Sequence, residues 1–374
     1  MASHTSEDIF GYTGEDCHVP KDVVSVRFHS SVIGVPANDH TFKGTGIKEV
    51  ELNEGLLKIC MWAFKDCNSL ERIVLPSTVT EIGEHAFCNC NTLKEVVLNE
   101  GLKRIGSNTF EECTALESIT IPSTLTYINR DAFKGCSNLR EVVLNEGLQK
   151  IGFGAFGKCA SLESITLPSV TKIEGAAFGH CQNMREVVLN EGLQKIGTLS
   201  FIGCDALESI TLPSTLTDDI ETGTFYHCNS LREVALNGNE KIQETAFAMC
   251  SSLERFTLPK LSSRLENIIQ TGHYQRVEAK IEEVRGTVER RGSDLFVTVT
   301  SMINVGRNWN AARQSLHQII KLIRYYEVKE ETTLFELVWK VKMGQVDDIN
   351  PMNRDAYRIE VPGTVKDTIL QYLW

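Results

Sequence analysis

A phenylalanine followed three residues later by a cysteine recurs nine times along this chain, at intervals of 22 to 24 residues. The cysteines are Cys67, Cys90, Cys113, Cys136, Cys159, Cys181, Cys204, Cys228 and Cys250. The phenylalanines are Phe64, Phe87, Phe110, Phe133, Phe156, Phe178, Phe201, Phe225 and Phe247. A fixed interval of this length is typical of repeat architectures, in which one short unit stacks on the next.

Each unit also carries a short apolar alternation after its cysteine, as in Leu70-x-x-Ile73-x-Leu75. An alternation with period two predicts a strand with one buried face. A unit of about 23 residues cannot enclose its own apolar side chains, so it must stack on its neighbours. Parallel strands lie about 4.8 Å apart, so ten units predict a rod about 45 Å long. We expect Leu and Ile to point inward and Phe and Cys to fill the next corner.

The repeated pattern AFxxCxxLxxIxLP…VxxIG resembles the BspA-like class of leucine-rich repeats, from about residue 47 to 258. The opening segment YTGEDCHVPKDVVSVRFHSSV is similar to the cap that begins an expanded diatom-type family of such proteins. The resemblance implies an α/β solenoid, a right-handed leucine-rich-repeat coil with a parallel sheet on its concave side. It implies no chemistry.

One unit, IGFGAFGKC, also contains Gly152-x-Gly154-x-x-Gly157 followed by Lys158, which is close to the spacing of two nucleotide-binding loops. The aligned units IGSNTFEEC and INRDAFKGC keep Phe and Cys, whereas the positions of the glycines vary from unit to unit. A phosphate loop also joins a strand to a helix, and no helical pattern follows Lys158. We therefore interpret the stretch as a repeat unit and predict no nucleotide cofactor.

The chain has 12 cysteines, and the nine repeated ones are predicted to be buried structural thiols. Disulfides between adjacent units are the alternative, which an intracellular location disfavours. Zinc needs ligands that converge on one point, and a linear series of cysteines does not supply them. We predict no metal site.

Odd and even units differ, which makes the larger repeat about 46 residues long. One class reads (L/M)(K/R)EVVLNEGL and the other LESITLPST. The first outward column alternates in charge from unit to unit: Lys48, Glu71, Lys94, Glu117, Arg140, Glu163, Arg185, Glu208, Arg232 and Glu254. Opposite charges facing each other across strands stabilise the pairing, so this column predicts a ladder of ion pairs. We interpret the Asn-Glu-Gly segments of the first class as residues chosen for a tight turn, with a calcium site as the alternative.

The second outward column is the candidate protein-binding face of the concave sheet. Its central residues are Glu95, Ser118, Glu141, Ser164, Glu186, Ser209 and Glu233. It lacks the aromatic and Arg anchors that binding faces usually present, so it is either plain scaffold surface or a weak site for a basic protein segment.

The sequence divides into three regions. Residues 1–46 form an N-terminal cap with a degenerate repeat, in which Thr45 stands in place of the cysteine. Residues 47–261 hold the repeats, and residues 262–374 are predicted to be a small, mainly helical C-terminal domain. The clearest apolar stripe with helical spacing in this region runs from Trp309 to Tyr326, and it either belongs to the core or forms a face for a partner helix.

Composition narrows the range of functions. The net charge is −11, and no basic cluster stands out, so nucleic acid is not an expected partner. The N-terminus lacks the pattern of a signal peptide, no run approaches a membrane span, and no Asn-x-Ser/Thr acceptor occurs, which together predict a cytoplasmic protein with no membrane partner. We find no catalytic motif and predict a non-enzymatic protein-interaction scaffold. The alternatives are a cell-surface recognition or adhesion protein, or an enzyme in residues 262–374 with a metal at Asp347, Asp348 and Asp355.

Overall fold

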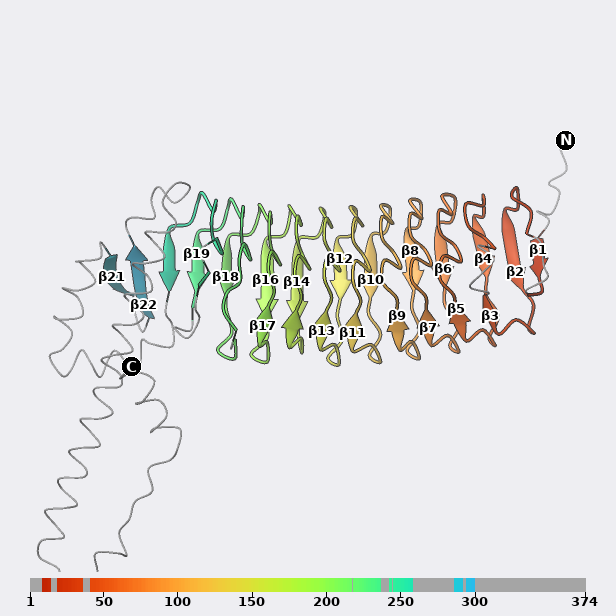
Figure 1. Ribbon diagram of the computed structural model, residues 1–374, viewed down its shortest axis with the longest axis horizontal. Coiled ribbons are helices and arrows are strands. Elements are labelled where there is room, and N and C mark those ends of the chain that lie inside the picture. Colours follow the sequence, from red (N-terminus) through yellow and green to blue (C-terminus); the bar gives the residue numbers. More distant parts are fainter. Residues whose placement is uncertain are drawn as a thin grey trace, which may run out of the picture.

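The computed structural model describes residues 9–14, 19–35, 41–216, 218–236, 242–243, 245–257, 286–291 and 294–299. The chain winds into a parallel β-solenoid of about ten turns, which we call rungs, stacked along one axis (Figure 1). No helix occurs among these residues, and none is therefore long and apolar enough to cross a membrane. The expected α/β solenoid is thus corrected to a coil of strands and turns.

The first row of strands contains the predicted alternating segments. It consists of β2 (Ser25–Phe28), β4 (Glu49–Glu51), β6 (Arg72–Val74), β8 (Glu95–Val97), β10 (Ser118–Thr120), β12 (Glu141–Val143), β14 (Ser164–Leu167), β16 (Glu186–Leu189), β18 (Ser209–Thr211), β19 (Glu233–Ala235) and β20 (Arg255–Thr257). Paired strands are parallel and in register, for example Ser118 with Glu141. The row is not one continuous sheet, however, because β6–β8, β10–β12 and β14–β16 pair as separate units. The larger repeat of 46 residues is therefore also the hydrogen-bonded unit along much of this row.

A second row of two-residue strands runs beside the first, and the sequence analysis missed it. It consists of β3 (Gly34–Val35), β5 (Lys58–Ile59), β7 (Glu81–Ile82), β9 (Arg104–Ile105), β11 (Tyr127–Ile128), β13 (Lys150–Ile151), β15 (Lys172–Ile173) and β17 (Lys195–Ile196). These strands form two parallel sheets of four. The second residue of each strand is buried in the core, as Val35 in β3 and as isoleucine in the other seven, while the residue before it lies toward the surface.

The segment that follows each second-row strand is a turn whose backbone binds the next rung. In the rung of Phe64, the amides of Trp62, Phe64 and Asp66 donate to carbonyls of the following rung at 2.8–3.0 Å. The intervening amide of Lys65 instead closes a turn onto the carbonyl of Trp62 at 3.1 Å. Trp62 and Asp66 both adopt left-handed backbone, with φ of 59° and 62°. Two left-handed residues within five positions are incompatible with an α-helix, which is why none forms here.

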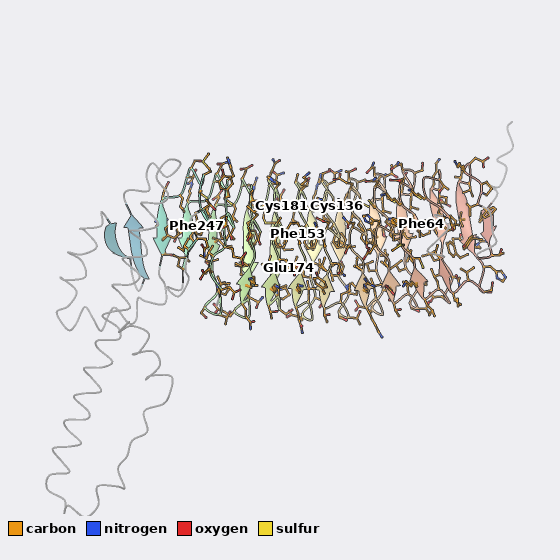
Figure 2. The ribbon with its side chains drawn as sticks, in the orientation of Figure 1. Phe64, Cys136, Phe153, Glu174, Cys181 and Phe247 are labelled. Atoms are coloured by element: carbon orange, nitrogen blue, oxygen red, sulfur yellow. The ribbon has the colours of Figure 1, made fainter. Side chains whose placement is uncertain are left out.

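The predicted interior of phenylalanine and cysteine is present in all nine repeat units. The nine repeat phenylalanines and Phe42 are fully buried and stack with ring centroids 4.9–5.5 Å apart and interplanar angles of 3–10°. Figure 2 labels Phe64 and Phe247, which lie near the two ends of this stack. Each repeat cysteine donates its S–H to the phenylalanine carbonyl of the preceding rung, as Cys136 does to Phe110 at 3.2 Å. The cysteine thus binds a buried carbonyl as well as filling space.

The first rung is closed by aromatic side chains. Strand β1 (Ile9–Tyr12) pairs in parallel with β2, and the Tyr12, Phe28 and Phe42 rings lie 4.9–5.6 Å apart. Thr45 occupies the cysteine position of this rung, and its hydroxyl donates to the Phe42 carbonyl at 2.7 Å.

At the other end of the solenoid, β20 pairs antiparallel with β22 (Asp294–Val299), which forms a hairpin with β21 (Gly286–Arg291). These strands lie in the region predicted to be mainly helical, and that prediction missed them. The signal was available, because two Val- and Thr-containing segments flank Gly292-Ser293. The helices predicted elsewhere in residues 262–374, including the Trp309–Tyr326 stripe, lie outside the described residues.

Candidate functional site

The seven candidate binding residues lie in one column on the outward side of the first-row strands, which we call the strand face. The pairing registers place Ser118 beside Glu141, Ser164 beside Glu186, and Ser209 beside Glu233. Six of the seven side chains are exposed, and Glu233 is half-buried. The alternation of strand residues produces this arrangement, because the residue between each pair of inward side chains must point outward.

Ion pairs occupy the two ends of this column. Arg72 Nε lies 2.7 Å from Glu95, and Arg255 lies 2.9 Å from Glu233. Glu141 and Glu186, near the middle, have no ion-pair partner within the described part of the chain. Within this column, the glutamates that no ion pair of the described residues neutralises are therefore the central ones, Glu141 and Glu186.

A column of exposed valines runs beside the glutamates. Val143 and Val188 follow Glu141 and Glu186 by two residues and are 45% and 44% exposed. Val74 and Val97 continue the column at 39% and 38%. The middle of the strand face thus combines carboxylates with aliphatic surface.

The predicted ladder of ion pairs in the first outward column is largely absent. Lys94 and Glu71 form an ion pair at 3.1 Å, and within the described rungs no other neighbouring pair of this column does so. The backbones do face each other as predicted, since the Arg140 amide donates to the Glu117 carbonyl at 2.9 Å. Exposed ion pairs contribute less than about 1 kcal/mol and cost side-chain entropy, so facing charges need not close.

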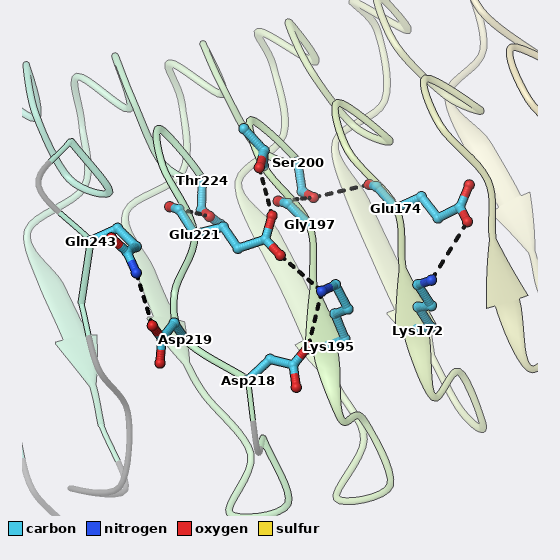
Figure 3. A network of polar contacts seen from close by, with 11 residues as sticks. Lys172, Glu174, Lys195, Gly197, Ser200, Asp218, Asp219, Glu221, Thr224 and Gln243 are labelled. Atoms are coloured by element: carbon cyan, nitrogen blue, oxygen red, sulfur yellow. Dashed lines mark hydrogen bonds and ion pairs between the residues drawn. The ribbon is translucent and has the colours of Figure 1, made fainter.

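Further ion pairs that cross-link rungs occur on the second row (Figure 3). Lys195 contacts Asp218 and Glu221, both at 2.9 Å, and these hydrogen bonds raise the pKa of Lys195. Lys150 and Lys172 both contact Glu174, at 2.6 and 3.8 Å. These ion pairs connect successive rungs, so the charged groups in them take part in holding the solenoid together.

A similar cross-link lies nearer the N-terminus. Glu81 bridges Lys58 at 2.9 Å and Arg104 at 2.7 Å. The sequence analysis missed these contacts because it followed only the first-row columns. A signal existed, since Lys58, Glu81 and Arg104 recur at the 23-residue spacing.

The glycine-rich stretch at residues 152–158 has no free amides for a phosphate. The Lys158 amide donates to the Gly179 carbonyl at 2.7 Å, and the Gly157 amide to Gly154 at 2.8 Å. Gly152 is nevertheless closely packed against the preceding rung. A Cβ added there would lie 2.7 Å from the backbone oxygen of Ile128 in the preceding rung.

The Asn-Glu-Gly turns use their carboxylates within the fold. Glu100 accepts hydrogen bonds from the amide and hydroxyl of Ser123, one rung further, at 2.9 and 2.7 Å. Asn99 donates to the carbonyls of Pro76 and Val79 in the preceding rung, both at 2.9 Å. These contacts agree with the prediction that the Asn-Glu-Gly segment serves the turn.

The cysteines of the described residues are free thiols, so the disulfide alternative does not apply to them. Burial raises the pKa of Cys67 and of Cys181 to about 12, which keeps both protonated at neutral pH. Cys88 lies outside the repeated series. Its sulfur, a ring nitrogen of His85 and a carboxylate oxygen of Glu111 all lie within 4.8 Å of one another.

The expectation about zinc concerned the repeated cysteines, and this cluster contains none of them. The sequence analysis considered only the nine repeated cysteines and therefore missed Cys88. The available signal was the spacing His85-x-x-Cys88, with Glu111 placed 23 residues after the cysteine. By contrast Asp347, Asp348 and Asp355, the alternative metal ligands, lie outside the described residues.

Comparison with known proteins agrees with the repeat geometry. Residues 36–163 and 149–273 match the model of the BspA type leucine-rich repeat region, with six copies. The chain belongs to this family. No curated protein sequence matches it.

Several solved structures are similar to this BspA-type chain. The leucine-rich repeat protein TpLRR of T. pallidum is 36% identical over 37% of this chain and 64% of its own length, with a TM-score of 0.34. A leucine-rich cell surface protein of Faecalibacterium prausnitzii is 20% identical over 66% and 89%, with a TM-score of 0.33. The pneumococcal vaccine antigen PcpA is 22% identical over 66% and 76%, with a TM-score of 0.39. This chain therefore spans less than two thirds of TpLRR.

A BspA-type repeat scaffold is compatible with protein binding or with surface recognition. In this chain the described surface offers two distinct groups of side chains. One is the middle of the strand face, with its carboxylates and valines, and the other is the cluster of His85, Cys88 and Glu111.

Proposed function

We propose that this chain is a non-enzymatic protein-interaction scaffold whose strand face binds an extended basic segment of a partner protein. The observation that carries the proposal is the pair of exposed glutamates, Glu141 and Glu186, without ion-pair partners in the described rungs. The equivalent glutamates toward the two ends, Glu95 and Glu233, are neutralised by arginines of the chain itself. A basic partner would meet its strongest attraction at the middle of the face.

The spacing of the glutamates suggests the form of the partner segment. Glu141 and Glu186 are two rungs apart, and rungs stack about 4.8 Å apart, so the carboxylates are separated by about 10 Å along the rod. A polyproline II segment rises about 3.1 Å per residue and has three residues per turn. A Lys or Arg at every third residue would then face successive glutamates, and aliphatic residues between them would meet Val143 and Val188.

The non-enzymatic part of the proposal is supported by the contacts of the polar side chains, many of which join one rung to the next. Titratable groups of the second row form ion pairs between rungs, such as Lys195 with Glu221 at 2.9 Å. Turn carboxylates such as Glu100 accept hydrogen bonds from the neighbouring rung. These groups hold the scaffold together.

Synthetic peptides test the proposal. One peptide carries Lys at every third residue in a Pro- and Val-rich background, and a second has the same composition with Lys at every second residue. We expect the full chain to bind the first peptide more tightly, with an affinity that falls as salt rises. Glu141→Lys combined with Glu186→Lys should abolish this binding in a titration calorimeter.

The matched control reverses two exposed glutamates outside the strand face, Glu84 and Glu146, to lysine. This variant has the same net charge as the strand-face variant and should keep the binding. Equal loss in both variants would show that only net charge matters. Unchanged binding by the strand-face variant would place the contact elsewhere, and either result would reject the proposal.

A further inference from the structure

In the rungs of Phe110 and Phe133 the turn brings two side chains together, those of the residue two before the phenylalanine and the residue one after it. In the rung of Phe110 these are Asn108 and Glu111, and Asn108 Nδ2 donates to Glu111 Oε2 at 2.8 Å. In the preceding rung the same two positions hold His85 and Cys88, and the Cys88 amide donates to the His85 carbonyl at 3.2 Å. The turn therefore places the imidazole and the thiol side by side.

The stacking of rungs adds a third side chain to this pair. Glu111 follows Cys88 by one repeat and occupies the same position in the next rung. Contact between successive residues of this column also occurs one rung further, where Lys134 Nζ lies 3.3 Å from Glu111 Oε1. The result is one imidazole nitrogen, one sulfur and one carboxylate oxygen within 4.8 Å of one another.

The fold does not account for these residue types. The position of Cys88 holds Lys65, Lys134 and Gly157 in other rungs, so neither a thiol nor an apolar group is required there.

The imidazole provides an independent sign of a missing ligand. His85 Nδ1 is buried and has no hydrogen-bond partner. Buried polar atoms nearly always have a partner, and one that lacks it needs an explanation. The Trp62 ring lies 6.5 Å from the His85 ring at an interplanar angle of 29°, so it covers the imidazole without satisfying this nitrogen.

We propose that His85 Nδ1, Cys88 Sγ and a carboxylate oxygen of Glu111 bind one Zn²⁺ ion, with a solvent molecule as the fourth ligand. Nitrogen, sulfur and oxygen donors together suit zinc, whereas calcium and magnesium take oxygen ligands. With metal–ligand bonds of about 2.0–2.3 Å, tetrahedral ligand atoms lie about 3.5 Å apart. The side chains would therefore close by about 1 Å on binding. The thiol proton passes to solvent as the zinc–sulfur bond forms.

The surroundings of Glu111 also fit a ligand carboxylate. Asn108 and Lys134 each contact one of its oxygens and would orient it, as outer partners of metal ligands generally do. The positive charge of Lys134 opposes a nearby cation, but Asp131 lies 3.6 Å from the same ammonium group and offsets it.

Cobalt is the probe that tests this site, because it replaces zinc and reports its ligands by colour. We expect the full chain to take up one equivalent of Co²⁺ with a thiolate-to-cobalt charge-transfer band, which one equivalent of Zn²⁺ removes. Cys88→Ser should abolish the band and weaken Zn²⁺ binding, measured against a chromophoric chelator, by at least about tenfold, since loss of even an outer partner costs that much. His85→Asn should weaken it similarly, and its backbone will tolerate the change because Asn108 has left-handed φ of 57° at the same position.

The control is Cys60→Ser, which removes a half-buried cysteine that lies outside the repeated series and leaves the cluster intact. It should keep the band and the zinc affinity. Circular dichroism will establish that each variant is folded. Absence of the band in the unmodified chain, persistence of the band in Cys88→Ser, or its loss in Cys60→Ser would overturn the assignment.

Discussion

Replacing Phe156 by alanine gives the most direct measure of what the ring stack contributes to stability. The ring is fully buried between Phe133 and Phe178, with centroids 5.4 and 5.5 Å away and interplanar angles of 5° and 6°. Truncation of a buried phenylalanine costs about 3–5 kcal/mol. Both neighbouring rings are themselves held in the stack and cannot move into the space, so we expect a cost of about 4 kcal/mol.

Urea unfolding followed by circular dichroism converts this cost into a midpoint. With a slope of about 3 kcal/mol per molar for a chain of this size, the midpoint should fall by about 1.3 M. Phe153 supplies the matched control, because it lies in the same turn but is 43% exposed. Its main interaction is with the Arg130 guanidinium 4.8 Å from the ring centroid, which is worth about 0.5–1 kcal/mol at an exposed site.

Phe153→Ala should therefore shift the midpoint by about 0.3 M at most. Equal shifts in the two variants, or a shift below about 0.3 M for Phe156→Ala, would refute the conclusion that the stacked rings hold the rungs together.

Three further predictions concern thiols, close packing and pH. Native Cys181 should be alkylated far more slowly than half-buried Cys60. Burial raises the pKa of Cys181 to about 12 and so lowers its thiolate fraction about a thousandfold. Mass spectrometry of a timed reaction will show which cysteine reacts first, and equal rates for Cys181 in native protein and in urea would contradict the prediction. Gly152→Ala should lower the urea midpoint by about 0.5 M or more, because the alanine Cβ would lie 2.7 Å from the Ile128 carbonyl oxygen. An unchanged midpoint would show that the two rungs can move apart at this position and would contradict the prediction. Hydrogen bonding from Lys58 and Arg104 lowers the pKa of Glu81 below 4.5. The stabilisation of the folded state by this carboxylate, less than about 1 kcal/mol, is therefore present above pH 4.5 and is lost as the pH falls further. Glu81→Gln should make the unfolding free energy depend less on pH in this range, and an identical pH profile in the variant would contradict the prediction.

The features predictable from the sequence are those that every rung repeats. The interval from Phe133 to Phe156 defines the rung, and the alternation around Ile119 defines the strand and its buried face. From these two facts the outward column of Glu141 and its neighbours follows directly, because strand alternation assigns each residue to a face.

The features that were missed depend on contacts between rungs. A two-residue strand such as Lys150–Ile151 has no alternation that a sequence pattern could reveal. Left-handed backbone at Trp62 is held by hydrogen bonding to the next rung, not by the residue type, so the turns look like possible helical segments until the rungs are stacked. The cluster of His85, Cys88 and Glu111 likewise requires knowing which positions of two successive rungs face each other.

The antiparallel pairing of β20 with β22 has a consequence for how the molecule meets its own copies. A row of parallel strands ends in unpaired amides and carbonyls, which could accept the first rung of another molecule and so build a filament. The hairpin covers this edge, because β22 pairs with β20 in the opposite direction, as the pairing of Phe256 with Val297 shows. A chain that ends at residue 257 would present that edge uncovered, and we expect such a chain to polymerise head to tail where the longer chain does not.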